Sequence, residues 1–445
     1  MKRKKMKATL CLLGSLMFVG GELEASEKGE VMKKNKKLVV NTPLEEVREI
    51  HSYYSNPENV VMLQMANEKT MSVWQNMSSY FPTSQILRDG AISNLPLNLD
   101  SSIGELNFKT TKDAKSRTVN DFFEKSNMDS IIVIQNGEVK FEQYKTMRER
   151  DKHNWFSVGK TIPGTLIALL AEEGKLDMKN PVSTYIPELK GSEWYSVTVE
   201  QTMDMTTGLN STEHDEKEEP RLNPESGWYR WAVSIGLFSG ENKEEVYDVL
   251  SDMKRDKSAY TSFEYNSINT FVLETIVENV SGKSLAETFS DKVWSKVGMQ
   301  NDAYVAITPD AHTMSFGLAS STLRDLGRFG MIYTPSWDKI TDEKIISDKI
   351  IKEIQTGGNK EIYNKGAVGK IMVDAFHEDS EMANRYQWDA VFTDGDFFKG
   401  GVGGQGLYIS PSDDIVIAWF ATGTEHHEET MARAIAKGIK KHQNN

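Results

Sequence analysis

Ser157 and Lys160 stand three residues apart at the start of a long apolar run, in FSVGKTIPGTLIALLAEEG. Helical spacing puts the two side chains on one face, within hydrogen-bond reach of each other. Serine is a weak nucleophile until a base removes its proton, and lysine can act as that base only as the free amine. The reference pKa of lysine is about 10.4, and burial or nearby positive charge lowers it. The pair therefore predicts an enclosed site for nucleophilic catalysis.

An isolated Ser-x-x-Lys also fits a helix cap followed by a solvated lysine, so the surrounding sequence has to decide. Tyr265, which opens YNS, would by itself fit a buried tyrosine at a helix start. Further segments accompany them in a fixed order: KLDMKNPVSTYIPEL, VTVEQTMDMTTGL, FEYNSINTFVLETIVENVSGKSL, GLASSTLRDLGRFGMIY and GDFFKGGVGGQGLYISP. This set resembles the β-lactamase-related serine hydrolases of the penicillin-recognising fold over roughly residues 75–435. It most resembles the 6-aminohexanoate-dimer hydrolase branch, which often carries YxS and GxxGQ.

The resemblance implies an α/β (α+β) fold of the β-lactamase/transpeptidase type, an antiparallel sheet flanked by helices with a mostly helical insertion. It implies that Ser157 is the acylated nucleophile, Lys160 its proton acceptor and Tyr265 the group that carries a proton to and from the leaving group. The phenol has a reference pKa near 10, so we expect it to need the positive charge of Lys160 nearby. The backbone N–H groups of Ser157 and Val402 would bind the oxyanion.

Three further positions are expected to bind substrate: Ser267, Lys399 and Gly401. Ser267 stands where β-lactamases carry asparagine, so it can hydrogen-bond Lys160 or substrate but lacks an amide that β-lactam recognition uses. Lys399 matches the K-T-G slot, and it either faces the site and binds a carboxylate or is a solvated loop lysine. Gly401 lies at a sheet edge whose bare backbone lets substrate lie close.

Other motifs predict no cofactor. Gly401, Gly403 and Gly406 fit G-x-G-x-x-G, but they run into the strand-like LYISP instead of opening a helix, which argues against a dinucleotide site. EHHEE at residues 425–429 lacks the H-E-x-x-H spacing of zinc sites and is expected to be a charge cluster at a helix start. The sequence has no G-x-S-x-G nucleophile elbow. We therefore expect neither a metal nor an organic cofactor.

The first 25 residues predict a signal peptide. A basic start, MKRKKMK, precedes the apolar ATLCLLGSLMFVG, which is short for a bilayer span, and cleavage is expected after Ala25 or Gly21. The alternative is an uncleaved anchor. Cys11, the only cysteine, lies in this segment, so the mature chain would have no disulfide and no cysteine metal site. We expect export to the periplasm, cell surface or medium, without stable membrane insertion after cleavage.

The charge argues against some partners. The formal net charge of the 445 residues is −13, and loss of residues 1–25, whose net charge is +3, leaves −16. No long basic stretch remains, so nucleic acid and anionic membranes are not expected partners. The sequence does not predict the oligomeric state.

The predicted elements place strands at both ends of the chain and helices between them. Strand-like runs flank Asn136-Gly137, a strong hairpin signal, and a helix should run from Ser157 to a cap at Gly174, with Pro163 in its second turn as a source of a kink. The acidic run EHDEKEEP, which begins at Glu213, is expected to be a solvated loop. Strand runs GLYISP and IVIAWFAT return before a C-terminal helix.

These elements predict a sheet whose halves come from distant sequence, interrupted by a helical insertion. We expect residues 26–110 to form an N-terminal extension packed on the catalytic domain. Residues 111–175 and 300–445 would form the sheet part. Residues 176–299 would form the helical insertion that carries the Tyr265 motif.

The expected function is that of an exported serine hydrolase that cleaves a short linear amide or ester through an acyl-enzyme. Its partner would be a small-molecule or short peptide-like substrate. One alternative is a D-alanyl-D-alanine carboxypeptidase or a class C-like β-lactamase. The other is a non-catalytic envelope protein that binds cell-wall peptides at the same place.

Overall fold

The computed structural model describes residues 38–110, 115–214, 220–240, 243–376, 381–423 and 427–443, so the expected signal peptide lies outside the described residues. The strands are β1 Thr83–Ile86, β2 Asn107–Lys109, β3 Ser116–Thr118, β4 Met128–Gln135, β5 Glu138–Tyr144, β6 His153–Asn154, β7 Ala303–Ala306, β8 Ala319–Ser321, β9 Ala383–Arg385, β10 Trp388–Val391, β11 Phe397–Gly401, β12 Gln405–Ser410 and β13 Ile415–Ala421. The α-helices are α1 Leu44–Tyr54, α2 Glu68–Trp74, α3 Ser102–Glu105, α4 Val119–Lys125, α5 Thr161–Glu172, α6 Val199–Met203, α7 Gly227–Ser234, α8 Val246–Asp252, α9 Ser267–Ser281, α10 Leu285–Phe289, α11 Leu323–Met331, α12 Asp348–Thr356, α13 Lys360–Tyr363, α14 Ala367–Ala375 and α15 Glu428–Gln443.

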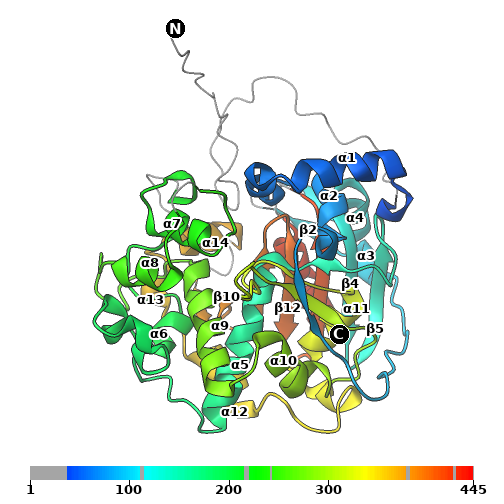
Figure 1. Cartoon of the computed structure of the whole chain (residues 1–445). Coiled ribbons are helices and arrows are strands. Elements are labelled where there is room, and N and C mark those ends of the chain that lie inside the picture. The colour runs from blue at the N-terminus through cyan, green and yellow to red at the C-terminus, as the bar shows by residue number, and fades with distance from the viewer. Residues whose placement is uncertain are drawn as a thin grey trace.

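The main sheet has seven antiparallel strands in the order β5-β4-β13-β12-β11-β10-β9. Within this sheet, β4 from the early part of the chain pairs with β13 from its late part, from Met128↔Ala421 to Gln135↔Ile415. Figure 1 shows the early cyan strands beside the late orange and red ones. The expected α/β fold, with an antiparallel sheet built from distant parts of the chain, is confirmed.

The conformation of the first hairpin is set by its two turn residues. Asn136 has φ 52° and Gly137 has φ 72°, the left-handed conformation that a two-residue hairpin turn requires. The turn joins β4 to β5, so the hairpin predicted from Asn-Gly is confirmed.

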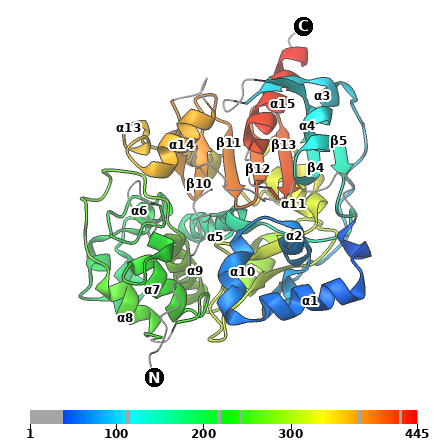
Figure 2. The same cartoon turned by 90° about the horizontal axis from the view of Figure 1, so that it is seen from above.

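Alternating side chains of the central strands fill two separate cores. Ile132 and Ile134 of β4 pack with α5, α9 and α11, whereas Ile131 and Val133 pack with α4 and α15. Successive side chains of a strand point to opposite faces, and β4 is buried at every position, so both of its faces are covered. Figure 2 shows α15 on one side of the sheet and α11 on the other. The site therefore stands on a sheet that is buried on both faces.

A second, smaller sheet has the order β1-β7-β8-β6. It ends in β6, which leads directly into the Ser157 turn. Beside the main sheet lie α6, α7 and α8, and α5 and α9 pack together between them and the strands (Figures 1 and 2).

The helix that follows Ser157 begins later than its sequence predicts. A 3-10 helix spans Phe156–Lys160, and α5 begins only at Thr161. Pro163 is thus the third residue of α5 and lies in its first turn, although the 3-10 helix runs into α5 without a break. The predicted end is confirmed, since Gly174 has φ 69° just beyond the helix.

Candidate active site

The Ser157 turn brings the serine and the lysine together. In a 3-10 helix, side chains three residues apart lie directly above one another. The Nζ atom of Lys160 lies 3.1 Å from Oγ of Ser157. Phe156, just before the serine, has φ 46°, a left-handed conformation that is costly for a bulky side chain. The serine therefore stands on a tight, strained turn with its neighbouring lysine aimed at it.

Lys160 is almost fully buried, and its hydrogen-bond partners among the described residues are all uncharged. Its Nζ donates to Oγ of Ser157 and of Ser267, the latter at 2.9 Å, and to the carbonyl of Phe316 at 2.7 Å. Burial lowers the pKa of Lys160 to about 8, against the opposing charge of Glu213 and with a further contribution from Lys399. About one in ten of these lysines is therefore a free amine at pH 7, far more than for a solvated lysine.

Tyr265 lies next to both the serine and two lysines. Its ring centroid is 5.2 Å from Nζ of Lys160 and 4.8 Å from Nζ of Lys399, and its phenol hydrogen-bonds to Ser157. Burial nevertheless raises the pKa of Tyr265 well above its usual value, and the carboxylates of Asp389 and Glu213 raise it further. The two cations that surround the ring do not offset these effects. Tyr265 is a neutral phenol that can donate a proton.

Ser267 is the first residue of α9 and belongs to the same network. Its Oγ accepts from Lys160, and its backbone N–H donates to Oε2 of Glu213 at 3.0 Å. The side chain of Asn266 caps the helix by accepting from the N–H of Ile268. The YNS motif thus starts the helix, orders the lysine and positions the tyrosine.

Glu213 corrects the expectation of a solvated acidic loop. It is 4% exposed and accepts from Nε1 of Trp228 at 2.7 Å as well as from Ser267. Its pKa is lowered: burial, the largest single effect, would raise it, but the charge of Lys160 and the other opposing groups together outweigh burial. The neighbouring His214 is neutral near pH 7, because burial lowers its pKa to about 4. The rest of the run, residues 215–219, lies outside the described residues.

Lys399 is neither exposed nor in a loop, so the solvated-lysine alternative is wrong. It lies on β11 with its side chain 0% exposed, and its Nζ donates to Asp389 at 2.5 Å and to Oη of Tyr265 at 3.5 Å. The carboxylate that it faces thus belongs to this chain. Nothing in the sequence singled out Asp389, because only the strand pairing brings it opposite the lysine.

The end of β11 packs directly against the Ser157 turn. A Cβ atom at Gly401 would lie 2.7 Å from the carbonyl oxygen of Trp155 and 3.1 Å from the amide nitrogen of Ser157. Only glycine allows this approach, which brings the following residue, Val402, next to the turn. The sequence-based assignment of the N–H groups of Ser157 and Val402 to an oxyanion stays a prediction.

The glycines after Lys399 form a hairpin and do not open a helix. Gly403 and Gly404 have φ 81° and 89° in the turn, and β12 pairs antiparallel with β11 from Gly401↔Gln405 onward. A dinucleotide fingerprint requires a helix at this point, so the structure rules that interpretation out.

Glu274 holds the carbonyl that Lys160 contacts. This residue of α9 is 2% exposed, and its Oε1 accepts from Oγ of Ser315 at 2.6 Å and from the N–H of Phe316 at 2.9 Å. A Cβ at Gly159 would lie 2.1 Å from the carbonyl oxygen of Ser315, so this loop presses against the nucleophile turn. Burial raises the pKa of Glu274 well above its usual value. No sequence pattern marks Glu274 for this role, because it is one of several acidic residues in a helical run.

The remaining motifs contribute no ligand set to the described part of the chain. Glu428 and Glu429 of EHHEE lie in the first turn of α15, whereas residues 425 and 426 are not described. Within the described ranges, no three His, Cys, Asp or Glu side chains are grouped so that they could hold a metal ion. The same ranges contain no helix that is both long and apolar enough to cross a bilayer.

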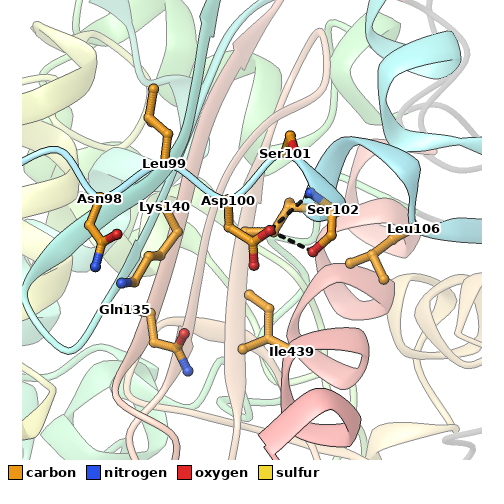
Figure 3. Close-up of a pocket in the computed structure, with 10 residues that line it drawn as sticks. Asn98, Leu99, Asp100, Ser101, Ser102, Leu106, Gln135, Lys140 and Ile439 are labelled. Atoms are coloured by element: carbon orange, nitrogen blue, oxygen red, sulfur yellow. Dashed lines mark hydrogen bonds between the residues drawn. The ribbon is translucent and has the colours of Figure 1, made fainter.

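A cavity of about 450 Å³, shown in Figure 3, has none of the Ser157 site residues in its lining. It is lined by Asn98, Leu99, Asp100, Ser101, Ser102, Ile103, Leu106, Gln135, Lys140 and Ile439. Asp100 is bonded to Ser102 and Lys140 to Glu138, so its polar groups are largely engaged with one another and with their neighbours. We assign it no role.

Comparison with known proteins places this geometry in a family. The family described as Beta-lactamase matches residues 123–439. The chain is 27% identical to a 6-aminohexanoate-dimer hydrolase of Paenarthrobacter ureafaciens, over 81% of this chain and 91% of that protein. It is 23% identical to a teichoic acid D-alanine hydrolase of Staphylococcus aureus, over 47% of this chain and 49% of that one.

A solved structure shares the fold. A Bacillus anthracis protein assigned as a 6-aminohexanoate-dimer hydrolase superposes with a TM-score of 0.71 at 22% identity, covering 85% of this chain and 95% of that one. The expected β-lactamase-like fold and the resemblance to the 6-aminohexanoate-dimer hydrolases are confirmed. The chain belongs to the Beta-lactamase family and is a serine hydrolase.

Proposed function

We propose that this protein cleaves a short linear amide or ester through an acyl-enzyme on Ser157, with Lys160 as the base. The observation that carries the proposal is the position of Lys160. Its Nζ lies 3.1 Å from Oγ of Ser157, and burial lowers its pKa to about 8. A buried amine of that pKa, in contact with a hydroxyl, suits a general base near neutral pH.

Acylation begins when the free amine of Lys160 takes the proton of Ser157 and Oγ attacks the substrate carbonyl. The oxyanion that forms lies between the backbone N–H groups of Ser157 and Val402. One such donor typically accounts for about 3–4 kcal/mol of transition-state stabilisation. The close contact of Gly401 with the amide of Ser157 supports this placement of the two donors.

Tyr265 protonates the leaving group as the bond to the carbonyl carbon breaks. Its raised pKa keeps it as a phenol, and the lysine that gained the serine proton restores it. Water then attacks the acyl-enzyme with the same groups acting in reverse, and Ser157 recovers its proton. Ser267 keeps the amine of Lys160 in place through its 2.9 Å contact.

The substrate class follows from the relatives and from Ser267. The similarity to a 6-aminohexanoate-dimer hydrolase over most of both chains supports a short linear amide, and an ester is the easier substrate for the same chemistry. The alternative of a D-alanyl-D-alanine carboxypeptidase or class C-like β-lactamase is less well supported, because Ser267 replaces an asparagine amide. The non-catalytic wall-peptide binder is disfavoured because Ser157, Lys160 and Tyr265 lie in mutual contact.

Mass spectrometry of the protein after exposure to a mixed panel of linear amides, esters and β-lactams tests the proposal. We expect an acyl adduct on Ser157 from an ester or amide, labelling of Ser157 by a fluorophosphonate, and hydrolysis of p-nitrophenyl esters. Labelling that persists in Ser157→Ala would overturn the nucleophile assignment. Turnover of a chromogenic cephalosporin alone would favour the β-lactamase, and binding of wall peptides without turnover would favour the binding protein.

We also propose that residues 1–25 direct export and are removed. The basic start followed by a short apolar segment supports this. Sequencing the N-terminus of protein isolated from cell fractions tests it. A mature protein outside the cytoplasm that begins near residue 22 or 26 is expected, and an intact N-terminus in the cytoplasmic fraction would refute it.

A further inference from the structure

Lys399 and Asp389 face each other across two neighbouring strands. Asp389 lies on β10 and Lys399 on β11. They stand next to the registered pair Ala390↔Phe398, at the adjacent position of the antiparallel pairing. Nζ of Lys399 donates to Oδ1 of Asp389 at 2.5 Å, and the N–H of Gly400 donates to Oδ2 at 3.0 Å. Both oxygens of the carboxylate are therefore engaged by β11, which fixes its charge beside the lysine.

This ion pair leaves the lysine no exposed surface to offer to a substrate. The side chain of Lys399 is 0% exposed and that of Asp389 is 5% exposed. A substrate carboxylate that approached this ammonium would lose its hydration and would also meet the like charge of Asp389. Both effects oppose binding, because a desolvated anion needs a positive partner that is not already neutralised.

The pair borders the leaving-group side of the site. Lys399 lies 3.5 Å from Oη of Tyr265, and Tyr265 is the proton donor to the leaving group in the proposed function, on which this inference rests. A charge on the leaving group close to the scissile bond would therefore come near Asp389 and Lys399.

The other charges near Tyr265 are also balanced within the chain. Lys160 and Arg221 both lie within electrostatic range of the buried carboxylate of Glu213. Glu213 and Asp389 both act on Tyr265, so two carboxylates face the region where the leaving group forms. A carboxylate on the leaving group would place a third negative charge beside these two.

We infer that the Asp389–Lys399 pair makes this hydrolase selective by charge. It accepts acyl compounds whose leaving group is neutral or cationic near the scissile bond, and it rejects those whose leaving group carries a carboxylate there. Asp389 is the residue that determines this specificity. A D-alanyl-D-alanine peptide releases an amine with an adjacent carboxylate, so it falls in the rejected class.

Two esters that differ by one charge test the inference. The butyrate ester of methyl 3-hydroxybenzoate and that of 3-hydroxybenzoate have the same acyl group and the same attachment, but only the second leaving group is anionic. At pH 6.5 we expect kcat/KM to be at least about tenfold higher for the neutral ester. Equal values, or a preference for the anionic ester, would overturn the inference.

Asp389→Asn should reduce the ratio of kcat/KM for the neutral ester to kcat/KM for the anionic ester at least fivefold. The anionic leaving group then meets a lysine that is no longer neutralised by a carboxylate. Asp394→Asn is the matched control, since it removes the same charge from the turn between β10 and β11 and should leave the ratio unchanged. A ratio unchanged in Asp389→Asn, or equally changed in Asp394→Asn, contradicts the role of Asp389.

Binding separates this inference from the proposed function. If neither ester is hydrolysed and Ser157 is never acylated, the proposed function fails. The charge selectivity is then measured by ligand-observed NMR with Ser157→Ala, using N-butyryl-3-aminobenzoate and its methyl ester. At least tenfold tighter binding of the methyl ester supports the inference, and the absence of a measurable preference for it refutes it.

Discussion

The two sides of the site each contain a fully buried lysine, and the two lysines have opposite chemistry. Lys160, on the nucleophile turn, contacts two hydroxyls and a carbonyl, whereas Lys399, on the sheet, contacts a carboxylate. Both amines lie about 5 Å from the ring of Tyr265, at 5.2 and 4.8 Å. Equal burial and a shared neighbour therefore do not give the two lysines the same role.

The contacts of each lysine explain the difference. Burial lowers the pKa of both lysines, and among the described residues a carboxylate in direct contact, that of Asp389, opposes this effect at Lys399 but not at Lys160. Lys160 can lose its proton at moderate cost and is suited to be a base. Lys399 is paired with Asp389 and contacts Tyr265. The carboxylate of Asp389 thus gives Lys399 a different role from that of Lys160.

Removing the amine of Lys160 should have the largest effect on activity. In Lys160→Met we expect kcat/KM for an ester to fall by about 10³-fold, within the usual range for loss of a general base. The unfolding free energy should stay within about 1 kcal/mol, because the change removes a desolvated amine that has no direct carboxylate partner. Kinetics and urea denaturation of the same sample measure both, and a variant that keeps its activity would refute the assignment of the base.

Lys399→Met should have the opposite profile. It leaves Asp389 buried without its ammonium, and breaking a buried pair in this way typically costs about 3–5 kcal/mol of stability. We therefore expect a much larger loss of unfolding free energy than in Lys160→Met. Asp394→Asn, which breaks a more exposed contact with Arg433, is the control and should lose much less. Equal unfolding free energies of the two lysine variants would contradict the different roles of Lys160 and Lys399.

The pH dependence should report Lys160. The free amine is the active form, so kcat/KM rises with pH and levels off above the pKa of about 8. Two units below that value, at pH 6, activity should be about 100-fold lower than the plateau. A pH–rate profile that is flat between pH 6 and 9 would mean that Lys160 is not the titrating base.

Glu274 should have the smallest effect, and its two variants should differ. Glu274→Gln keeps an oxygen that can accept from Ser315 and Phe316, and burial already disfavours the charged form of this carboxyl by raising its pKa, so activity should stay within about threefold. Glu274→Ala releases the carbonyl that stabilises the ammonium of Lys160. We then expect kcat to fall about tenfold and the acid limb of the pH profile to move to lower pH. Identical profiles for the two variants would show that Glu274 does not position Lys160.

Local patterns in the sequence predicted the elements and the reactive groups. Asn136-Gly137 sets a turn by its own backbone preference, and Ser157 and Lys160 are close because three residues separate them. Asp389 could not be found in the same way, because it contacts Lys399 only through the pairing of β10 with β11. Glu213 and Glu274 resemble surface residues in sequence and are buried by tertiary packing. Long-range contacts therefore determine which charges surround the reactive groups.

The pairing of β4 with β13 has a consequence for the timing of synthesis. Ser157, Lys160 and Tyr265 leave the ribosome well before residues 397–421, which form β11, β12 and β13 and supply the amide of Val402. Until those last strands are inserted beside β4, the growing chain has a serine and a base but no strand to complete the reactive centre. If the proposed mechanism holds, we expect the nascent protein to have no hydrolase activity until its synthesis is almost finished.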